Sequence, residues 1–106
     1  MTELQHFFTP NLRDLIGDAP SQSIVSRTFY EDDRMKAILF GFDAGQELSE
    51  HTAARPAILH FIQGEAELTL GEQRMTVSAG AWAHMPPRLP HSIVAKTRVI
   101  MLLILV

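Results

Sequence analysis

The sequence contains no cysteine, which excludes both a disulfide framework and a zinc site built on thiolates. It also lacks any run of basic residues, because its nine Lys and Arg are scattered and the net charge is −3. Binding to nucleic acid requires a clustered basic surface, so we predict no nucleic-acid partner. The absence of cysteine fits the reducing cytoplasm, where we expect this protein to be found.

Long hydrophobic segments are missing as well. The longest apolar run, residues 99–106, has eight residues, whereas a membrane-spanning helix needs about 20. The first 20 residues lack the basic start and apolar core of a secretion signal. We therefore predict no membrane partner. We interpret residues 99–106 as a strand buried on both faces, either central in a sheet or covered by a second subunit.

Helical periodicity is almost absent. Residues 11–17 predict one short helical turn, because Asn11 can cap it and Gly17 can end it. Most of the remaining chain alternates in polarity or is rich in β-branched and aromatic residues, as is typical of strands. Strands are expected at residues 23–30, 35–43, 56–64, 65–70, 75–79, 81–85, 91–96 and 98–106, with a polar loop at residues 44–50.

This pattern predicts one all-β domain that spans residues 1–106. About eight or nine short strands separated by turns indicate a small antiparallel β-barrel or jelly roll. Residues 1–22 form an N-terminal segment that contains the helical turn. Residues 35–106 contain two motifs with a regular spacing of glycine, proline and histidine.

The first motif has Gly45, five further residues, His51, and later Gly64; the second has Gly80, five further residues, Pro86, and then His91. Together they resemble the two motifs of the cupin family over roughly residues 35–106. The resemblance implies the cupin-like double-stranded β-helix. It also implies that a small molecule binds inside the barrel.

In cupins a divalent metal is typically held by two His and one Glu from the first motif and one His from the second. The resemblance places these ligands at His51, Ala53, Ala57 and His91, so that two of the four positions are alanine. An Fe, Mn, Ni or Zn ion on two imidazoles would be bound more weakly than one on three or four ligands. His51 and His91 are thus candidate metal ligands, and a metal-free pocket is the open alternative.

Another histidine would have to supply a third ligand. His84 shares one face of residues 81–85 with Trp82 and is the better candidate. His60 follows Ala57 by three residues, so the period of a strand places it on the opposite face, in the sheet or at a dimer contact. Glu50 beside His51 is a further candidate for a metal ligand or a base, but we interpret it as a surface charge.

Bulky apolar side chains are expected to line the cavity and to form the substrate pocket. They are Phe40, Phe42, Leu59, Phe61 and Ile93. A mostly apolar cavity with a few polar groups is typical of a small-molecule site. Arg55 and Arg88 stand on the loops beside His51 and His91, either as attractors of an anionic ligand or as ordinary exposed residues.

Two functions from different classes therefore remain open. One is a metal-dependent enzyme acting on a small organic molecule, as many cupins are oxygenases, isomerases or lyases. The other is a metal-free binding or sensing module. No catalytic residue is identified, and whether the protein is an enzyme is left open.

Residues 56–63 are apolar on both faces of the expected strand, and a single barrel interior can cover only one of them. The other face carries Ile58, His60 and Ile62. The N-terminal segment or a second subunit must cover it, and we predict a symmetric homodimer.

Overall fold

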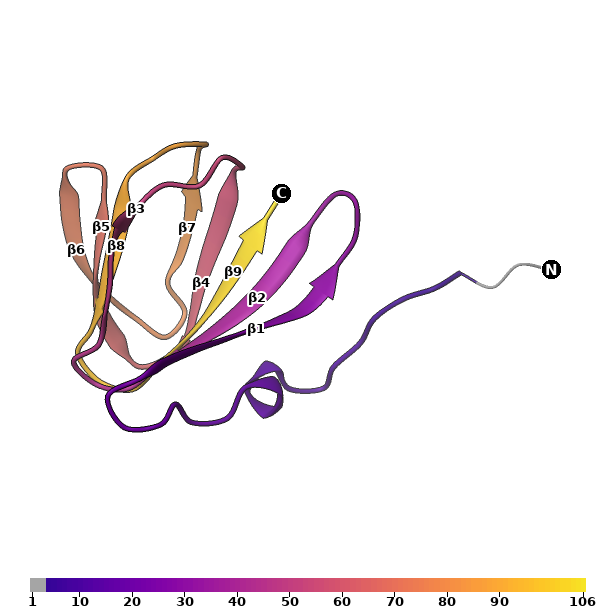
Figure 1. Cartoon of the computed structure of the whole chain (residues 1–106), viewed down its shortest axis with the longest axis horizontal. Helices are drawn as coiled ribbons and strands as arrows, with labels where there is room; N and C mark the ends of the chain where they lie inside the picture. Colours follow the sequence, from indigo (N-terminus) through magenta and orange to yellow (C-terminus); the bar gives the residue numbers. More distant parts are fainter. Residues whose placement is uncertain (1–3) are drawn as a thin grey trace.

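The computed structural model describes residues 4–106 and confirms the all-β prediction (Figure 1). Its elements, in chain order, are η1 (Leu12–Leu15), β1 (Ile24–Glu31), β2 (Lys36–Phe42), β3 (Glu47–His51), β4 (Ala57–Gln63), β5 (Glu65–Leu70), β6 (Gln73–Ser78), β7 (Trp82–Met85), β8 (His91–Ala95) and β9 (Val99–Leu105). The element that the sequence did not predict is β3, which occupies most of the expected polar loop. β3 lies at the edge of its sheet, so most of its side chains are exposed and polar. Its sequence therefore resembles that of a loop.

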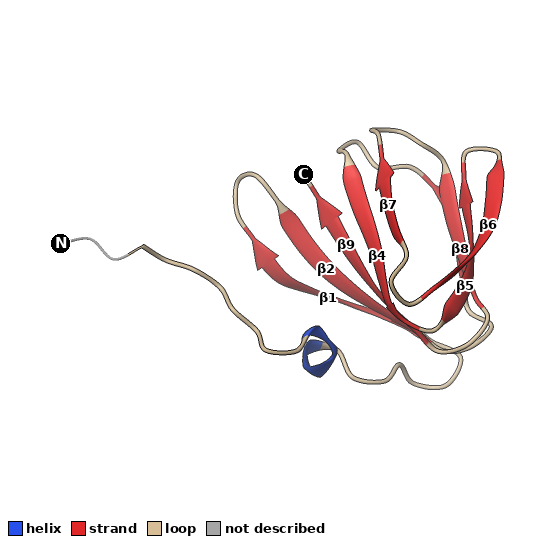
Figure 2. Ribbon diagram, turned by 180° about the vertical axis from the view of Figure 1, so that it is seen from behind, coloured by secondary structure: helices blue, strands red, loops and turns tan. Residues whose placement is uncertain are grey.

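The strands form two antiparallel sheets that face each other in a jelly roll (Figure 2). One sheet has the order β1-β2-β9-β4-β7 and the other the order β3-β8-β5-β6. β9 lies in the middle of the five-stranded sheet, hydrogen-bonded to β2 and β4. This position confirms the interpretation of the C-terminal apolar run as a central strand, because a strand covered on both faces has no side chain that must reach water.

The hydrophobic core fills the space between the sheets. Alternate residues of β4 and β5 point into it, including Leu59, Phe61 and Leu68, each 1% exposed. Phe42 of β2 and Met101 of β9 complete the centre of this cluster. The packing explains why these strands carry bulky apolar residues at every second position.

A second, smaller cluster lies on the outer face of the five-stranded sheet. There Leu12 and Leu15 of η1 pack against Leu39 and Ile100. The helix begins as predicted, since the Asn11 side chain accepts a hydrogen bond from the Arg13 N–H at 3.1 Å. The N-terminal segment thus covers one part of this outer face.

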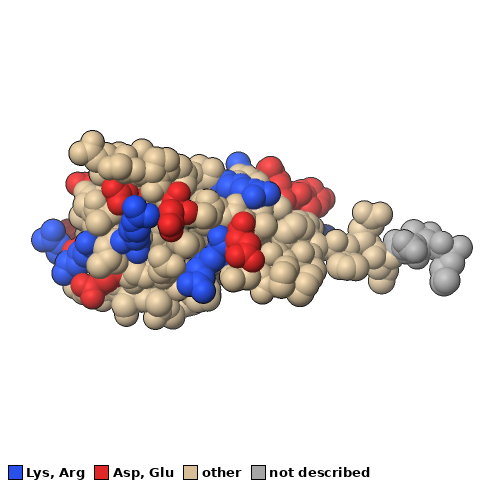
Figure 3. Space-filling view, turned by 90° about the horizontal axis from the view of Figure 1, so that it is seen from below, with Lys and Arg blue, Asp and Glu red and all other residues tan. Residues whose placement is uncertain are grey.

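Charged residues lie on the surface in mixed signs, without a patch of one sign on the face that Figure 3 shows. Arg98 lies within 4 Å of carboxylate oxygens of Asp18 and Asp43, and Lys96 pairs with Glu65 and Glu67. Such exposed pairs contribute at most about 1 kcal/mol each. In the part of the chain that the structure describes, no helix is long and apolar enough to cross a bilayer.

Candidate functional site

The two histidines of the motifs meet at one rim of the jelly roll. His51 ends β3, His91 begins β8, and the two residues are direct partners in the antiparallel ladder. The loops that follow β3 and precede β8 both cross to the five-stranded sheet at this rim (Figure 1). They are tied together where the Arg88 N–H donates to the Ala53 carbonyl oxygen at 2.7 Å. The rim therefore has a defined backbone around the histidine pair.

A β-bulge turns His51 toward the interior. Leu48 pairs with Ile93 and His51 pairs with His91, so three steps on β3 match two steps on β8. Without the extra residue, strict alternation would place Leu48 and His51 on opposite faces of the strand. The bulge at Ser49 and Glu50 instead lets both side chains share the inward face.

The two imidazole rings are close together, with centroids 4.1 Å apart and planes inclined by 60°. His91 is 5% exposed, whereas His51 lies at the exposed edge of the rim. Each ring is held by its own backbone: Nδ1 of His51 lies 2.8 Å from the Ser49 carbonyl oxygen, and Nδ1 of His91 lies 2.9 Å from the Leu89 carbonyl oxygen. Both rings are oriented in the same way, through a carbonyl two residues earlier.

These contacts decide which nitrogen is available. A carbonyl oxygen only accepts hydrogen bonds, so in the neutral ring Nδ1 carries the hydrogen and Nε2 carries the lone pair. Orientation of a histidine by a carbonyl at its second nitrogen is also the usual arrangement around a protein-bound metal. Burial lowers the pKa of His91, and the nearby His51 charge lowers it further, while the Leu89 carbonyl raises it in part. His91 therefore stays neutral, with its Nε2 lone pair available, to a lower pH than a solvated histidine.

The two histidines can hold a divalent ion, but they form only part of the usual set of ligands. Two imidazoles bound to one ion at about 2.1 Å have ring centroids roughly 4.4–5 Å apart, so the observed 4.1 Å requires only a small movement. Ala57 is 1% exposed and points inward opposite Met85, while Ala53 is half-buried in the loop. Within residues 4–106, no group of three or more His, Cys, Asp or Glu side chains lies close enough to hold an ion. The rim thus offers two protein ligands.

The structure corrects the assignment of His84 as a third ligand. On β7, Ala83 and Met85 point into the core, and so the exposed His84 and Trp82 point to the outer face of the five-stranded sheet. His84 pairs with Ile58, which faces outward as well. The sequence could not decide this, because the proline-containing loop before His91 interrupts the alternation. His60 faces outward, as predicted from its spacing to Ala57.

The predicted substrate-pocket residues do face the interior, but they fill it. Phe42, Leu59, Phe61 and Ile93 are each 1% exposed and pack in one cluster, to which the half-buried Phe40 adds its ring. Side chains with so little exposure leave no room for a ligand among them. The assignment is therefore corrected: these residues form the packed core beneath the rim and do not line a pocket.

The loop arginines differ from each other. Arg55 is tied to the protein, because its guanidinium donates to the carbonyl oxygens of Arg34 and Leu105 at 3.0 and 3.5 Å. Arg88 is exposed and has a φ of +67°, a conformation that favours the glycine usual at this position of the cupin motif. Arg88 is the loop arginine that could meet an anionic ligand.

Comparison with known proteins gives the family. A sequence profile described as "Cupin domain" matches residues 38–106, which is well over half of the chain. The chain belongs to the cupin family. A search of curated proteins found no match to it.

Solved structures, two of them described as cupins, superpose on most of the chain. A cupin superfamily protein from Desulfitobacterium hafniense DCB-2 superposes with a TM-score of 0.84 at 26% identity, covering 99% of this chain and 98% of its own. A conserved protein of unknown function from Streptococcus pyogenes gives a TM-score of 0.83 at 26% identity, with coverage of 99% and 91%. A cupin 2 conserved barrel domain protein from Leptotrichia buccalis gives 0.83 at 27% identity, covering 91% of this chain and 46% of its own.

Within this cupin, the sequence missed the groups that orient the histidines. The acceptors are backbone carbonyls of Ser49 and Leu89, and a carbonyl leaves no signature in the residue type. The odd spacing between Leu48 and His51 was the available sign of the bulge, because two inward residues on a regular strand are separated by an even number of positions.

Proposed function

We propose that this cupin binds a small molecule at the rim of its jelly roll, with His51 and His91 presenting their Nε2 atoms to a weakly held divalent metal ion. One observation carries the proposal. The two ring centroids lie 4.1 Å apart, and a backbone carbonyl fixes each ring through Nδ1, which leaves Nε2 as the donor atom. Two imidazoles held this close, each with a lone pair on Nε2, are suited to a single shared ion.

A bound divalent ion would supply a Lewis acid with open coordination positions for the small molecule. The protein residues have separate roles around it. The Ser49 and Leu89 carbonyls hold the two imidazoles in one orientation, and burial of His91 keeps that ring neutral. The packed core beneath the rim, including Ile93, excludes water from the inner side.

Two imidazoles alone hold an ion weakly, so the ligand's own oxygen or nitrogen atoms would have to complete the coordination sphere. A small chelating molecule, such as one with neighbouring hydroxyl and carboxylate groups, matches this requirement. The exposed Arg88 on the adjoining loop favours an anionic ligand over a cationic one. The proposal is one of binding and assigns no catalytic residue.

A metal-free binding or sensing module is the second candidate. The observation that favours it is the pair of alanines at the other two ligand positions, Ala53 and Ala57. In this case the two Nε2 atoms would accept hydrogen bonds from hydroxyl or amide groups of the ligand.

Metal content distinguishes the two candidates. Protein without a histidine tag is loaded with iron, manganese, nickel or zinc, and the bound metal is counted for the parent, His51→Ala and His91→Ala. His60→Ala and His84→Ala are matched controls, because both histidines lie on the outer face of the other sheet. We expect the metal to be lost in the first two variants and kept in the controls.

If none of the four metals binds the parent protein, the metal proposal is wrong and the metal-free candidate remains. That candidate is tested by a thermal-shift screen with chelating and anionic small molecules. Stabilisation should grow with the logarithm of ligand concentration and be lost in His91→Ala. The absence of any such ligand-dependent shift would argue against a binding pocket at the rim.

A further inference from the structure

A methionine side chain lies at the same end of the jelly roll as the histidine pair. Met85 ends β7, is 2% exposed and faces the interior, where it packs in the core cluster. In the strand ladder it is the direct partner of Ala57, the position at which the cupin pattern has its carboxylate ligand. Direct partners in an antiparallel ladder have Cβ atoms about 4.5–5.5 Å apart. The long thioether side chain of Met85 therefore stands beside the space that the small Ala57 side chain leaves open.

The connection from β7 to β8 brings Met85 toward the histidine pair. It contains a tight turn, in which the Leu89 N–H donates to the Pro86 carbonyl oxygen at 3.3 Å. The Cα atoms at the two ends of such a turn lie within about 7 Å of each other. Met85 directly precedes this turn, and His91 follows it by two residues. Both side chains are almost fully buried, so a thioether and an imidazole enter the interior at the same end, from facing sheets.

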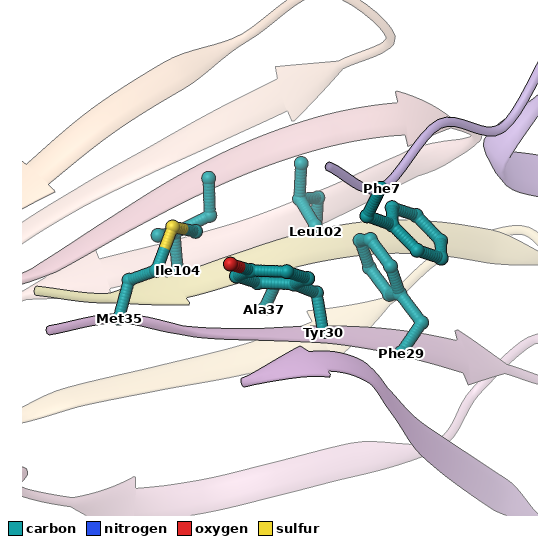
Figure 4. A pocket seen from close by; sticks show the side chains of 7 residues that line it. All are labelled: Phe7, Phe29, Tyr30, Met35, Ala37, Leu102 and Ile104. Carbon is teal, nitrogen blue, oxygen red and sulfur yellow. The ribbon is translucent and has the colours of Figure 1, made fainter. Parts of the chain in front are cut away.

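The other methionines in residues 4–106 lie elsewhere. Met35 lines a hollow of 380 Å³ on the outer face of the five-stranded sheet, among aromatic rings (Figure 4). Met75, on the edge strand β6, is only partly buried against the core cluster. Met101 of β9 faces the interior, but it pairs with the fourth residue after Ala57, about 13 Å along the strand from the rim. Among these methionines, Met85 is the one that lies at the rim.

The donor atoms at the rim suit a soft ion of low charge. His51 and His91 offer imidazole nitrogen through Nε2, and Met85 adds thioether sulfur, in a chain that has no cysteine. Thioether sulfur is a ligand that selects Cu(I), whereas Mn(II) and Mg(II) prefer carboxylate and carbonyl oxygens. All three donors are neutral, so none of them compensates the charge of a bound ion. Holding one uncompensated positive charge in a partly buried site costs less free energy than holding two.

Methionine also has a purely structural use, because its unbranched side chain fills irregular gaps in protein interiors. Met85 fills such a gap beside Ala57. The two roles are compatible. A thioether is only a weak hydrogen-bond acceptor, so Met85 can be buried without a polar partner and still keep its sulfur lone pairs available.

We propose that the rim is a copper(I) site in which the Met85 thioether joins His51 and His91 as the third ligand. This inference rests on the proposed function, because it uses the same histidine pair, and it names the ion that the full set of donors prefers. His51 lies on the exposed side, from which an ion can enter, while His91 and Met85 form the buried side. The three rotatable bonds of the Met85 side chain let its sulfur adjust to an ion without a change in the backbone.

Competition with the copper(I) indicator bicinchoninate, under reducing conditions without oxygen, measures the affinity of the untagged full chain. We expect the parent to bind one copper(I) ion per chain. Met85→Leu nearly keeps the volume of the side chain but removes the sulfur, so it should weaken copper(I) binding at least about 10-fold. The affinity for manganese should not change in Met85→Leu, because this ion prefers oxygen ligands. Met101→Leu removes an equally buried sulfur on β9 and is the matched control, which should bind copper(I) as the parent does.

X-ray absorption at the copper edge gives a second measurement that needs no variant. The parent loaded with copper(I) should show one sulfur atom bound to copper, which no cysteine can supply. A spectrum without sulfur would overturn the proposal, and so would equal copper(I) affinities of the parent and Met85→Leu.

Failure of this inference is separable from failure of the proposed function. A parent protein that binds manganese or zinc through His51 and His91, but binds no copper(I), would overturn the copper(I) site alone. Copper(I) binding that depends on Met85, in a protein that takes up no divalent ion, would support the copper(I) site and refute the divalent one.

Discussion

Replacing Ala57 with glutamate tests whether this position still faces the histidine pair. Ala57 is 1% exposed and points into the jelly roll opposite Met85, at the end of β4 where the rim loops cross between the sheets. In the cupin pattern this position holds the metal-binding carboxylate. Without a metal, Ala57→Glu buries a carboxylate that has no partner of opposite charge.

The effect on stability should be large. Burial of an ionised carboxylate without a partner costs several kcal/mol, and we expect a loss of about 3–5 kcal/mol. The whole domain is expected to have a stability of about 5–15 kcal/mol. With about 4–8 °C per kcal/mol for a domain of this size, the melting temperature should fall by roughly 12–40 °C.

A metal ion should reverse part of this loss. With His51, His91 and the new carboxylate as ligands, a metal concentration of 100 times the dissociation constant restores about 2.7 kcal/mol. Urea unfolding followed by circular dichroism, with and without zinc or manganese, measures both quantities. Adding Ala53→His to Ala57→Glu should raise the metal affinity further. The affinity should stay below that of a natural four-ligand site if the new ligands lack partners that orient them.

Ala95→Glu is the matched control for this experiment. Ala95 is also 1% exposed and inward-facing, but it lies four residues beyond His91 on β8, which is about 13 Å along the strand. It should destabilise the protein to a similar extent without rescue by metal. Equal metal responses of Ala57→Glu and Ala95→Glu would refute the placement of Ala57 beside the pair.

Two further predictions concern His91 and the glycines of the motifs. Burial lowers the pKa of His91 in the folded state, so below about pH 6.5 the unfolded chain binds the proton more readily. The free energy of unfolding should therefore fall as the pH drops from 6.5 through the pKa of His91 in the folded state. This group contributes a slope of up to about 1.4 kcal/mol per pH unit, and it has no effect above pH 6.5. Urea unfolding at several pH values should show a smaller fall for His91→Gln, and identical pH profiles would contradict the assignment. Gly64 and Gly80 share a backbone conformation that favours glycine, with φ of +90° and +98°. Their surroundings differ. A Cβ at Gly64 would overlap the Arg98 carbonyl oxygen, whereas a Cβ at Gly80 would meet no atom within 4 Å. Gly80→Ala should cost about 1–2 kcal/mol, and Gly64→Ala clearly more; equal losses in urea unfolding would show that the close approach to Arg98 is unimportant.

The sequence by itself determined most of the fold and which side chains face the core. Period-two alternation correctly placed Phe42 and Leu59 inside and His60 outside, because a side chain that faces the core must be apolar. The uninterrupted apolar run at residues 99–106 correctly predicted a central strand. The resemblance of the motifs to cupins then paired His51 with His91, a long-range contact that local alternation does not contain.

Only the tertiary structure decided how the site is built. The bulge in β3 depends on pairing with β8, and that pairing turns His51 inward and fixes its ring on the Ser49 carbonyl. Likewise, the inward direction of Met85 and the outward direction of His84 follow from the register of β7 against β4. Whether Phe61 lines a cavity or fills a core depends on the distance between the two sheets, which is set by all the side chains between them and not by any one segment.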